Sequence, residues 1–388
     1  MLGGKIALKI SPGLLSELSR DRRIVLVSGT NGKSTTTAFT AAALREIGAV
    51  ATNANGDNML TGIVSALMET PDAPYAVLEV DEMYLPQVAE ATRPAAIVLL
   101  NLSRDQLDRV GEIGAVEERL REAVTASPQA AIVANCDDPL VASAAWGALK
   151  PVWVAAGAPW DADAVTFPRT GGIVIRSADG WEVLGDTPLE RPAPLWQVGL
   201  VTEDGTFTIF GPDQEITTQL ALPGRANRGN AAQAAAAASA LGVPPAAIGR
   251  ALSTVSGVAG RYRATDIDGR QARLLLAKNP AGWQESLTML DPDTPQLVIA
   301  VNAQVPDGVD TSWLWDVPFQ NLQDLGLTRI IASGERAADL ATRLEYAGVD
   351  FSVVDDLSAA LASCEPGPVD VVANYTAFRD IAKKWGLG

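Results

Sequence analysis

The stretch "VSGTNGKSTTT", residues 27–37, directly follows the strand-like run "RIVL" at residues 23–26. A buried strand, a glycine-rich turn and a helix start, in this order, are the setting of a phosphate-binding loop. The spacing departs from a Walker loop, since Gly29 stands only three positions before Gly32 and Val27 takes the place of the first glycine. The residue types still predict a nucleotide-binding α/β domain.

The residues of this loop suit the parts of a nucleotide phosphate site. Glycines permit a tight turn, Lys33 offers a positive charge to the β and γ phosphates, and a hydroxyl of Ser34 or Thr35 can bind Mg²⁺. The plainer alternative is a turn capped by Thr30 or Asn31 before an ordinary helix. We expect ATP contacts from the whole loop: Gly29, Thr30, Asn31, Gly32, Lys33, Ser34 and Thr35.

A second group of polar residues closes the run "YAVLEVDE", residues 75–82. An acid at the carboxyl end of a parallel strand faces the crevice where ligands bind, which makes Glu79 the expected Mg²⁺ carboxylate. Asp81 and Glu82 compete for that role. Their alternative is that of solvated turn acids, and this interpretation is favoured for Glu82.

Composition restricts the class of protein. The formal charge is -16, from 46 acidic and 30 basic residues, which argues against nucleic-acid binding and against a basic membrane-surface patch. The two cysteines, Cys136 and Cys364, are too few for a disulfide framework or a cysteine-only zinc site. We find no secretory signal and no apolar stretch of transmembrane length, and we expect a cytoplasmic protein that meets any lipid substrate at a surface.

The order of apolar runs predicts two domains. Runs such as "AAIVLLNLS" (95–103) and "AAIVANCDD" (130–138) alternate with helical segments, as in a parallel sheet covered by helices. Residues 151–222 read as an antiparallel β excursion, and an alanine-rich helix follows at about Asn227. We expect an ATP-binding domain over residues 1–257 and a smaller Rossmann-like α/β domain over residues 258–388.

The phosphate loop is typical of Mur ligases and folylpolyglutamate synthetases, and further motifs narrow the resemblance. From about Arg23 to Thr376, the chain resembles the MurT family, the Mur-ligase-like subunits of lipid II isoglutaminyl synthase. The motifs that carry the resemblance are "NANGDNM" (53–59), "EVDE" (79–82), "NLSRDQLDRVGEI" (101–113), "NCDDP" (135–139), "GRANRGNAAQA" (224–234), "KNPAG" (278–282), "DGVDTSWLWD" (307–316) and "NYT" (374–376).

This resemblance implies a function. It implies ATP-dependent amidation of the D-glutamate α-carboxylate in the peptidoglycan stem peptide, in complex with the glutamine amidotransferase subunit GatD. It also implies phosphate contacts from Lys33, Mg²⁺ binding by Glu79, nucleotide contact by Asn230 and an arginine, Arg261, directed toward the phosphates. Only 28 residues precede Gly29, too few for the domain with which other Mur ligases hold UDP-linked precursors, so we expect a substrate anchored in the membrane, lipid II.

This chain departs from the MurT family pattern at the expected zinc site. MurT-type chains often carry a four-cysteine zinc ribbon in the central domain, but residues 151–200 contain no cysteine here. We therefore predict that this chain has no zinc ribbon.

The absence of histidine bears on the source of ammonia. A glutaminase needs a thiolate activated by a histidine, and none of the 388 residues is a histidine. The glutaminase must then be another protein. The MurT resemblance implies that Asp310 supplies the acid of a triad whose Cys and His belong to that partner, because such an acid only has to orient the imidazole.

The alternative for Asp310 is a structural one. It can cap the helix that begins "TSWLW", with Trp313 packed inward, and the two roles are compatible. Trp313 and Trp315 are candidates for the partner contact, since aromatic residues are enriched in interface cores. Asp316 is interpreted as a surface acid of this helix.

The expected mechanism is transfer of the γ-phosphoryl group to the substrate carboxylate, followed by attack of ammonia on the acyl phosphate. Lys278 and Asn279 are further candidates for this site, although a loop contact between the two domains explains them equally well. Two rival functions share the nucleotide loop: a folylpolyglutamate synthetase-like ligase that joins an amino acid to a carboxylate, and an ATP-binding scaffold without chemistry.

Overall fold

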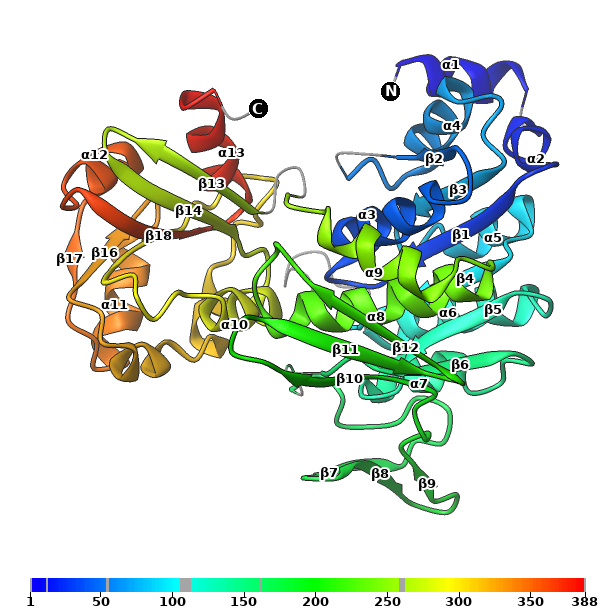
Figure 1. Ribbon diagram of the computed structural model, residues 1–388. Helices are drawn as coiled ribbons and strands as arrows, with labels where there is room; N and C mark the ends of the chain where they lie inside the picture. The colour runs from blue at the N-terminus through cyan, green and yellow to red at the C-terminus, as the bar shows by residue number, and fades with distance from the viewer. Residues whose placement is uncertain are drawn as a thin grey trace. The chain divides into compact units, whose positions relative to one another are not determined.

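A computed structural model gives the fold (Figure 1) and describes residues 2–11, 13–53, 56–104, 113–158, 160, 162–257 and 262–386. These residues form two compact units. Unit 1 comprises the described residues of 1–103 and 113–256, and unit 2 comprises residue 104, residue 257 and residues 262–386.

Unit 1 is built on a nine-stranded sheet with the order β12-β11-β10-β6-β5-β4-β1-β3-β2. From β2 to β10 all neighbouring strands are parallel, whereas β11 and β12 are antiparallel additions. The strands are β1 (Arg23–Ser28), β2 (Val50–Thr52), β3 (Tyr75–Glu79), β4 (Ala96–Leu99), β5 (Ala131–Asn135), β6 (Pro151–Ala155), β10 (Trp196–Val201), β11 (Thr206–Gly211) and β12 (Gln214–Gln219).

Strand β1 shows why the sequence folds this way. Every residue from Ile24 to Ser28 is buried, because helices cover both faces of a parallel sheet. Successive side chains point to opposite faces, so Ile24 and Leu26 join the core beneath α4 to α7, and Val25 and Val27 face the other helix layer. The loop that follows β1 therefore starts from a strand fixed on both sides.

The helices of unit 1 form two layers. In one layer α3 packs on α8 and α9, and in the other α5 packs on α6 and α6 on α7 (Figure 1). The alanines of α8 permit a close approach to α3, with ten of its residues buried. The helices are α1 (Leu2–Ile10), α2 (Leu14–Ser19), α3 (Lys33–Arg45), α4 (Leu60–Glu69), α5 (Leu85–Thr92), α6 (Ile113–Ala126), α7 (Pro139–Ala145), α8 (Arg225–Ala240) and α9 (Pro245–Ser253).

The prediction of an antiparallel β excursion over residues 151–222 is only partly correct, because β6 and β10 are parallel strands of the main sheet. Strands β10 to β12 extend the main sheet, while β7 (Ile173–Ser177), β8 (Gly180–Leu184) and β9 (Leu189–Glu190) form a separate antiparallel sheet. An aromatic cluster holds this small sheet, since Phe167 contacts Trp146 and Trp181 at ring-centroid distances of 5.8 and 5.7 Å. The indole nitrogen of Trp181 donates to the carbonyl of Cys136 at 2.9 Å and ties the sheet to the end of β5.

Unit 2 is a six-stranded α/β sheet with the order β13-β14-β18-β15-β16-β17, in which only β13 is antiparallel to its neighbour. One face packs on α10, α11, η2 and η3, and the other on α12 and α13. The strands are β13 (Tyr262–Ile267), β14 (Arg270–Leu276), β15 (Gln296–Ala300), β16 (Arg329–Ser333), β17 (Ser352–Val353) and β18 (Gly367–Ala373). The helices are α10 (Pro280–Thr288), η2 (Ser312–Asp316), η3 (Phe319–Leu325), α11 (Ala337–Tyr346), α12 (Leu357–Ala362) and α13 (Tyr375–Lys384).

The helices of the described ranges are short and mixed in polarity. None of them combines the length and the apolar character that a membrane span requires.

Candidate active site

The predicted phosphate loop lies at the carboxyl end of β1, between β3 and β4. Val27 pairs with Glu79 of β3 and Ser28 with Leu99 of β4, so the ends of three parallel strands meet at the loop. This is the edge of an α/β sheet where ligands bind. Helix α3 begins at Lys33, directly after the loop, and points its free backbone N–H groups into it.

Two glycines of the loop adopt backbone conformations that other residues avoid. Gly29 has φ of 131° and Gly32 has φ of 88°. A Cβ atom on Gly29 would lie 2.9 Å from the carbonyl oxygen of Asn101, and one on Gly32 would lie 2.7 Å from Oδ1 of Asn230. Both positions therefore require glycine, and the Gly32 contact brings Asn230 of α8 to the loop.

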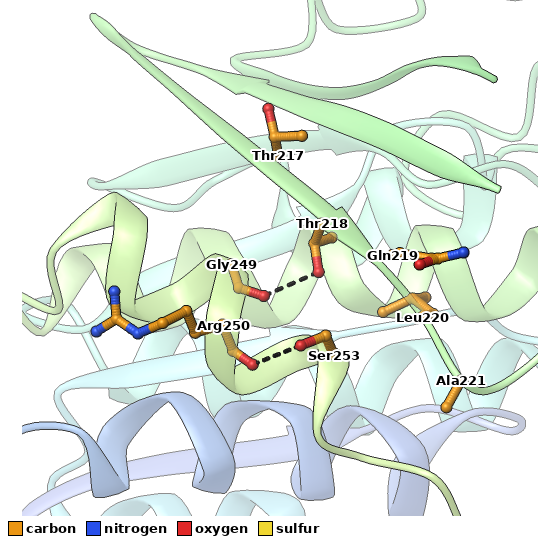
Figure 2. A pocket seen from close by; sticks show the side chains of 8 residues that line it. All are labelled: Thr217, Thr218, Gln219, Leu220, Ala221, Gly249, Arg250 and Ser253. Carbon is orange, nitrogen blue, oxygen red and sulfur yellow. Dashed lines mark hydrogen bonds between the residues drawn. The ribbon is translucent and has the colours of Figure 1, made fainter. Parts of the chain in front are cut away.

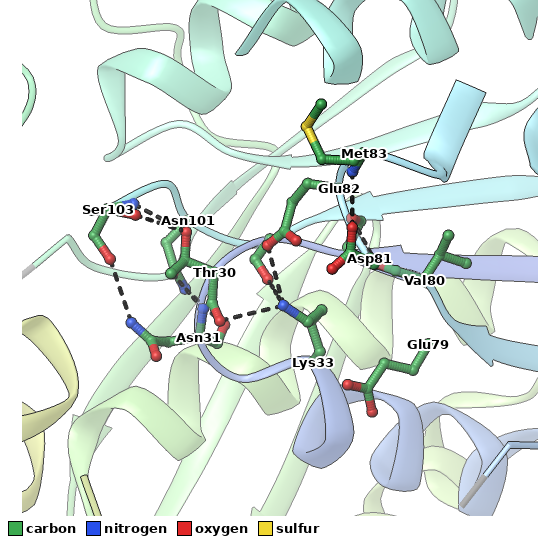
Figure 3. Close-up of polar contacts among 12 residues, drawn as sticks. Thr30, Asn31, Lys33, Glu79, Val80, Asp81, Glu82, Met83, Asn101 and Ser103 are labelled. Atoms are coloured by element: carbon green, nitrogen blue, oxygen red, sulfur yellow. Dashed lines mark hydrogen bonds and ion pairs between the residues drawn. The ribbon is translucent and has the colours of Figure 1, made fainter. Parts of the chain in front are cut away.

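The segment after β4 fixes the loop from the side (Figure 3). The backbone N–H of Asn31 donates to Oδ1 of Asn101 at 2.9 Å, and Nδ2 of Asn101 donates to the carbonyl of Asn31 at 2.9 Å. Thr30 Oγ1 donates to the carbonyl of Ser103 at 3.1 Å and accepts the N–H of Ser103 at 3.0 Å. Sequence reasoning did not assign this function to Asn101 and Ser103, although their position directly after an apolar strand was a usable signal.

Lys33 is buried, with 7% of its surface exposed. Its Nζ donates to the carbonyls of Gly29 at 2.5 Å and Thr30 at 3.3 Å, and to Oε1 of Glu82 at 3.0 Å (Figure 3). The favoured interpretation of Glu82 as a solvated turn acid is therefore wrong. Only 14% of its side chain is exposed, because the ion pair with Lys33 draws it into the site.

Ser34 and Glu79 provide two neighbouring oxygen donors. Ser34 Oγ donates to Oε2 of Glu79 at 2.7 Å, and Glu79 is 2% exposed. Asn53 fixes Glu79 by accepting its backbone N–H at 2.8 Å and donating to its carbonyl at 2.7 Å. A hydroxyl and a carboxylate are ligands that Mg²⁺ prefers, so the residues fit the expected ion. Asp81, by contrast, accepts the N–H of Met83 in the turn.

The remaining residues that were expected near the nucleotide occupy different kinds of position. Thr35 is buried in the first turn of α3. Asn230 lies against Gly32 and is 8% exposed. Arg261 lies outside the residues that the structure describes. Asn279 caps α10 by accepting the N–H of Gly282 at 2.8 Å.

Unit 2 carries Asp310 on its surface. The backbone N–H of Ser312 donates to Oδ1 of Asp310 at 2.8 Å, so the carboxylate holds the turn that leads into η2. The predicted N-cap role of Asp310 is wrong, since the N-cap residue of η2 is Thr311, which makes no side-chain cap bond. This bond and the Ser312 hydroxyl hold the pKa of the exposed Asp310 carboxyl below its usual range, which keeps the group ionised. A turn-stabilising hydrogen bond and an exposed, charged carboxylate are thus found together at Asp310.

The two tryptophans of η2 point in different directions. Trp313 is buried and stacks on Trp283 at a centroid distance of 5.6 Å, so it cannot line a partner contact. Trp315 is 55% exposed and rests edge-on against Tyr346 at 5.3 Å. Arg343 anchors the segment by donating to the carbonyls of Leu314 at 3.1 Å and Val317 at 2.7 Å.

Neither thiol of the chain suits nucleophilic chemistry. Burial, followed by the charge of Asp137, raises the pKa of Cys136 to about 12, and burial also raises the pKa of Cys364. Both side chains are buried. A protonated, buried thiol is a poor nucleophile, so both cysteines are structural.

An open pocket of about 540 Å³ lies away from these residues, between β12 and α9 (Figure 2). Its polar side chains already have partners: Thr218 donates to the carbonyl of Gly249 at 2.9 Å and Ser253 to that of Arg250 at 2.8 Å. None of the residues expected to bind nucleotide lines it.

The families that this chain matches are consistent with the geometry of the phosphate loop. Residues 27–155 match the Mur ligase middle domain family and residues 276–378 match the MurT ligase C-terminal family. The lipid II isoglutaminyl synthase (glutamine-hydrolyzing) subunit MurT of Streptococcus pneumoniae (strain ATCC BAA-255 / R6) is 32% identical, over 98% of this chain and 91% of that protein. The subunit of the same name from Staphylococcus aureus (strain COL) is 28% identical, over 97% of this chain and 90% of that protein.

Solved structures show the same fold. A pseudomurein peptide ligase type C from Methanothermus fervidus has a TM-score of 0.69 at 19% identity, over 94% of this chain and 79% of that chain. MurF ligase from Thermotoga maritima in complex with ADP has a TM-score of 0.63 at 16% identity, over 94% of this chain and 80% of that chain.

The sheet order, the phosphate loop and these similarities define an ATP-dependent ligase of the Mur ligase class. The match extends over nearly the whole chain of one relative and includes a domain typical of a single branch of that class. The chain belongs to the MurT family.

Proposed function

We propose that this chain is the synthetase subunit of a lipid II isoglutaminyl synthase. It amidates the α-carboxylate of D-glutamate in the lipid II stem peptide, at the inner face of the cell membrane. The single observation that carries the proposal is the meeting of Lys33, Ser34 and Glu79 at one sheet edge, in a chain whose MurT relatives bear this name.

The phosphate loop and the first turn of α3 bind ATP in this proposal. Backbone N–H groups at the start of α3 and the ammonium of Lys33 hold the phosphates, and Asn230 borders the same site across Gly32. Ser34 and Glu79 would hold Mg²⁺, which supplies positive charge against the phosphate oxygens.

The reaction proceeds in two steps. An oxygen of the substrate carboxylate attacks the γ-phosphorus, the bond from that phosphorus to the β-phosphate oxygen breaks, and ADP leaves. Ammonia then attacks the acyl carbon, the bond from this carbon to the phosphate-bearing oxygen breaks, and phosphate leaves with loss of one proton from nitrogen. Lys33 stabilises the charge on the transferred group.

A second chain supplies the ammonia. None of the residues of this chain is a histidine, so it cannot form a Cys-His pair of its own. A GatD-like glutamine amidotransferase subunit provides that pair, and Asp310, exposed and ionised, orients the partner's imidazole. Trp315, an exposed residue of η2, belongs to the contact surface.

Reconstitution with a GatD-like subunit, glutamine, ATP, Mg²⁺ and lipid II tests this proposal. Mass spectrometry should detect exchange of one OH for NH₂ on the stem peptide, with ADP and phosphate as the nucleotide products. AMP and pyrophosphate would exclude the acyl phosphate. Addition of an amino acid instead of ammonia would favour a folylpolyglutamate synthetase-like ligase, and slow ATP hydrolysis unaffected by lipid II would favour a scaffold.

A further inference from the structure

The ammonium of Lys33 has no free donor in the structure. It carries three protons, and three oxygens lie within hydrogen-bond distance: the carbonyls of Gly29 and Thr30 and the carboxylate of Glu82. Two of these acceptors belong to the phosphate loop itself. The third is a negatively charged side chain from the turn after β3, opposite the loop (Figure 3).

We propose that Glu82 is an internal competitor of the nucleotide phosphate. Its carboxylate pairs with Lys33 while the site holds no nucleotide, and it must leave Lys33 when ATP binds. This inference rests on the proposed ATP site and adds to it a positioning residue that the nucleotide has to displace.

Electrostatics make the two states exclusive. Lys33 is 7% exposed and the Glu82 side chain 14% exposed, so water screens little of their charge. A phosphate and the Glu82 carboxylate on the same ammonium would bring like charges together in that poorly screened place, which is unfavourable. One of the two anions therefore excludes the other.

Glu82 differs from Glu79 in how it is held. Asn53 fixes the backbone of Glu79 through two hydrogen bonds, and Ser34 fixes its carboxylate. Glu82 follows β3 in a turn, and its carboxylate is fixed by Lys33. Glu82 can thus move away without loss of the Ser34 and Glu79 pair.

The ion pair between Glu82 and Lys33 also stabilises the protein when no nucleotide is bound. A buried ammonium that lost its carboxylate would be an uncompensated charge, which is strongly destabilising. Glu82 keeps Lys33 paired and ordered close to the position where the phosphate will need it.

The test compares the wild type with Glu82→Gln, which keeps the shape of the side chain and removes its charge. Isothermal titration calorimetry measures ATP binding to the full chain, once with EDTA and once with Mg²⁺. Removal of a charge-assisted hydrogen bond from the competing state should tighten ATP binding about tenfold under both conditions. Glu82→Asp, whose shorter side chain cannot reach Lys33 in the same way, should also bind ATP more tightly.

Controls separate this effect from others. Glu90→Gln removes an exposed acid from α5 and should leave ATP affinity unchanged, and thermal unfolding of each variant checks that it is folded. Unchanged affinity in Glu82→Gln would overturn the proposal. Weaker binding only with Mg²⁺ would also overturn it, since Glu82 would then be a metal ligand. If the folded wild type fails to bind ATP at all, the proposed function itself fails.

Discussion

The Asp310 side chain both makes a structural hydrogen bond and carries an exposed negative charge. Its carboxylate accepts the N–H of Ser312 in the turn before η2, and the same bond lowers its pKa, so the group is an ionised acceptor throughout the neutral range. The burial of Trp313 against Trp283 and the bonds from Arg343 hold this segment in place. A carboxylate fixed in this way can orient an imidazole of another chain without reorganisation.

Replacement of Asp310 by asparagine should therefore separate two activities. We expect glutamine-dependent amidation by the complex to fall about 100-fold or more, as when a triad acid is removed. Amidation supported by ammonium chloride should remain unchanged, because the ATP site lies in unit 1. Rates of lipid II amidation with each nitrogen source measure the effect, and an equal loss of both activities would show a structural role.

Asp138 is a second residue whose ionisation matters. Its carboxylate is buried and accepts the N–H groups of Leu140 and Val141 at the start of α7 and that of Leu102 after β4. Burial raises the pKa of Asp138 to about 6, above its usual value of 3.8, despite these three bonds. The folded state thus binds a proton more tightly than the unfolded state.

The sign of the pH effect follows from this raised pKa. The stability that the proton contributes is complete below pH 3.8 and is lost as the pH rises through about 6. The difference in unfolding free energy between the wild type and Asp138→Asn should therefore fall by about 2 kcal/mol from pH 4.5 to 7. Urea unfolding at both pH values measures it. Asp186→Asn, at an exposed position, is the control, and a pH-independent difference for Asp138→Asn would contradict the raised pKa.

At the scale of elements, the sheet of β7 to β9 depends on one aromatic residue. Trp181 is 4% exposed, contacts Phe167 and donates a hydrogen bond to Cys136 of the main domain. Trp181→Ala should destabilise this sheet by about 3–5 kcal/mol, since it opens a large cavity. Hydrogen exchange should show lost protection in β7 and β8 while ATP binding persists. Ile175→Ala, which truncates an exposed side chain of β7, should have little effect, and equal protection in both variants would contradict the assigned role.

The same cluster bears on the prediction that the chain has no zinc ribbon. The packed residues of the small sheet are apolar and aromatic, namely Phe167, Val174, Trp181 and Val183. We therefore expect protein washed with a chelator to contain zinc well below one equivalent by elemental analysis. Stoichiometric zinc would contradict this expectation.

Strand identity was predictable where apolar runs are long, and strand partnership was not. The fully buried run of β1 and the alternating runs of β7 and β11 identify strands from sequence alone. That β10 joins β6 in parallel and extends the main sheet, while β7 to β9 form a sheet of their own, depends on contacts distant in sequence. The aromatic contacts of Trp181 hold the sheet of β7 to β9 apart from the main sheet, and no pattern in the neighbouring sequence predicts these contacts.

The whole molecule places its expected functions on separate units, with the phosphate loop in unit 1 and Asp310 in unit 2. The sequence predicted Lys33, Ser34 and Glu79 as a site because each stands at a strand end or helix start. It misjudged Glu82, since the turn after β3 brings that side chain to Lys33 only in the folded chain. Asn101 stands directly after an apolar strand, which placed it near the site, but its partner was not predictable because its bonds to Asn31 join segments 70 residues apart.

The most direct test of the proposed synthetase activity is amidation of lipid II with ammonium chloride in place of glutamine, with ATP and Mg²⁺, by the complex that contains this chain or its Lys33→Ala variant. We predict that the wild type yields the amidated product and that Lys33→Ala reduces its rate at least about 100-fold, with the variant still folded in thermal unfolding. Equal rates for the two proteins would show that the synthetase chemistry does not take place at this phosphate loop.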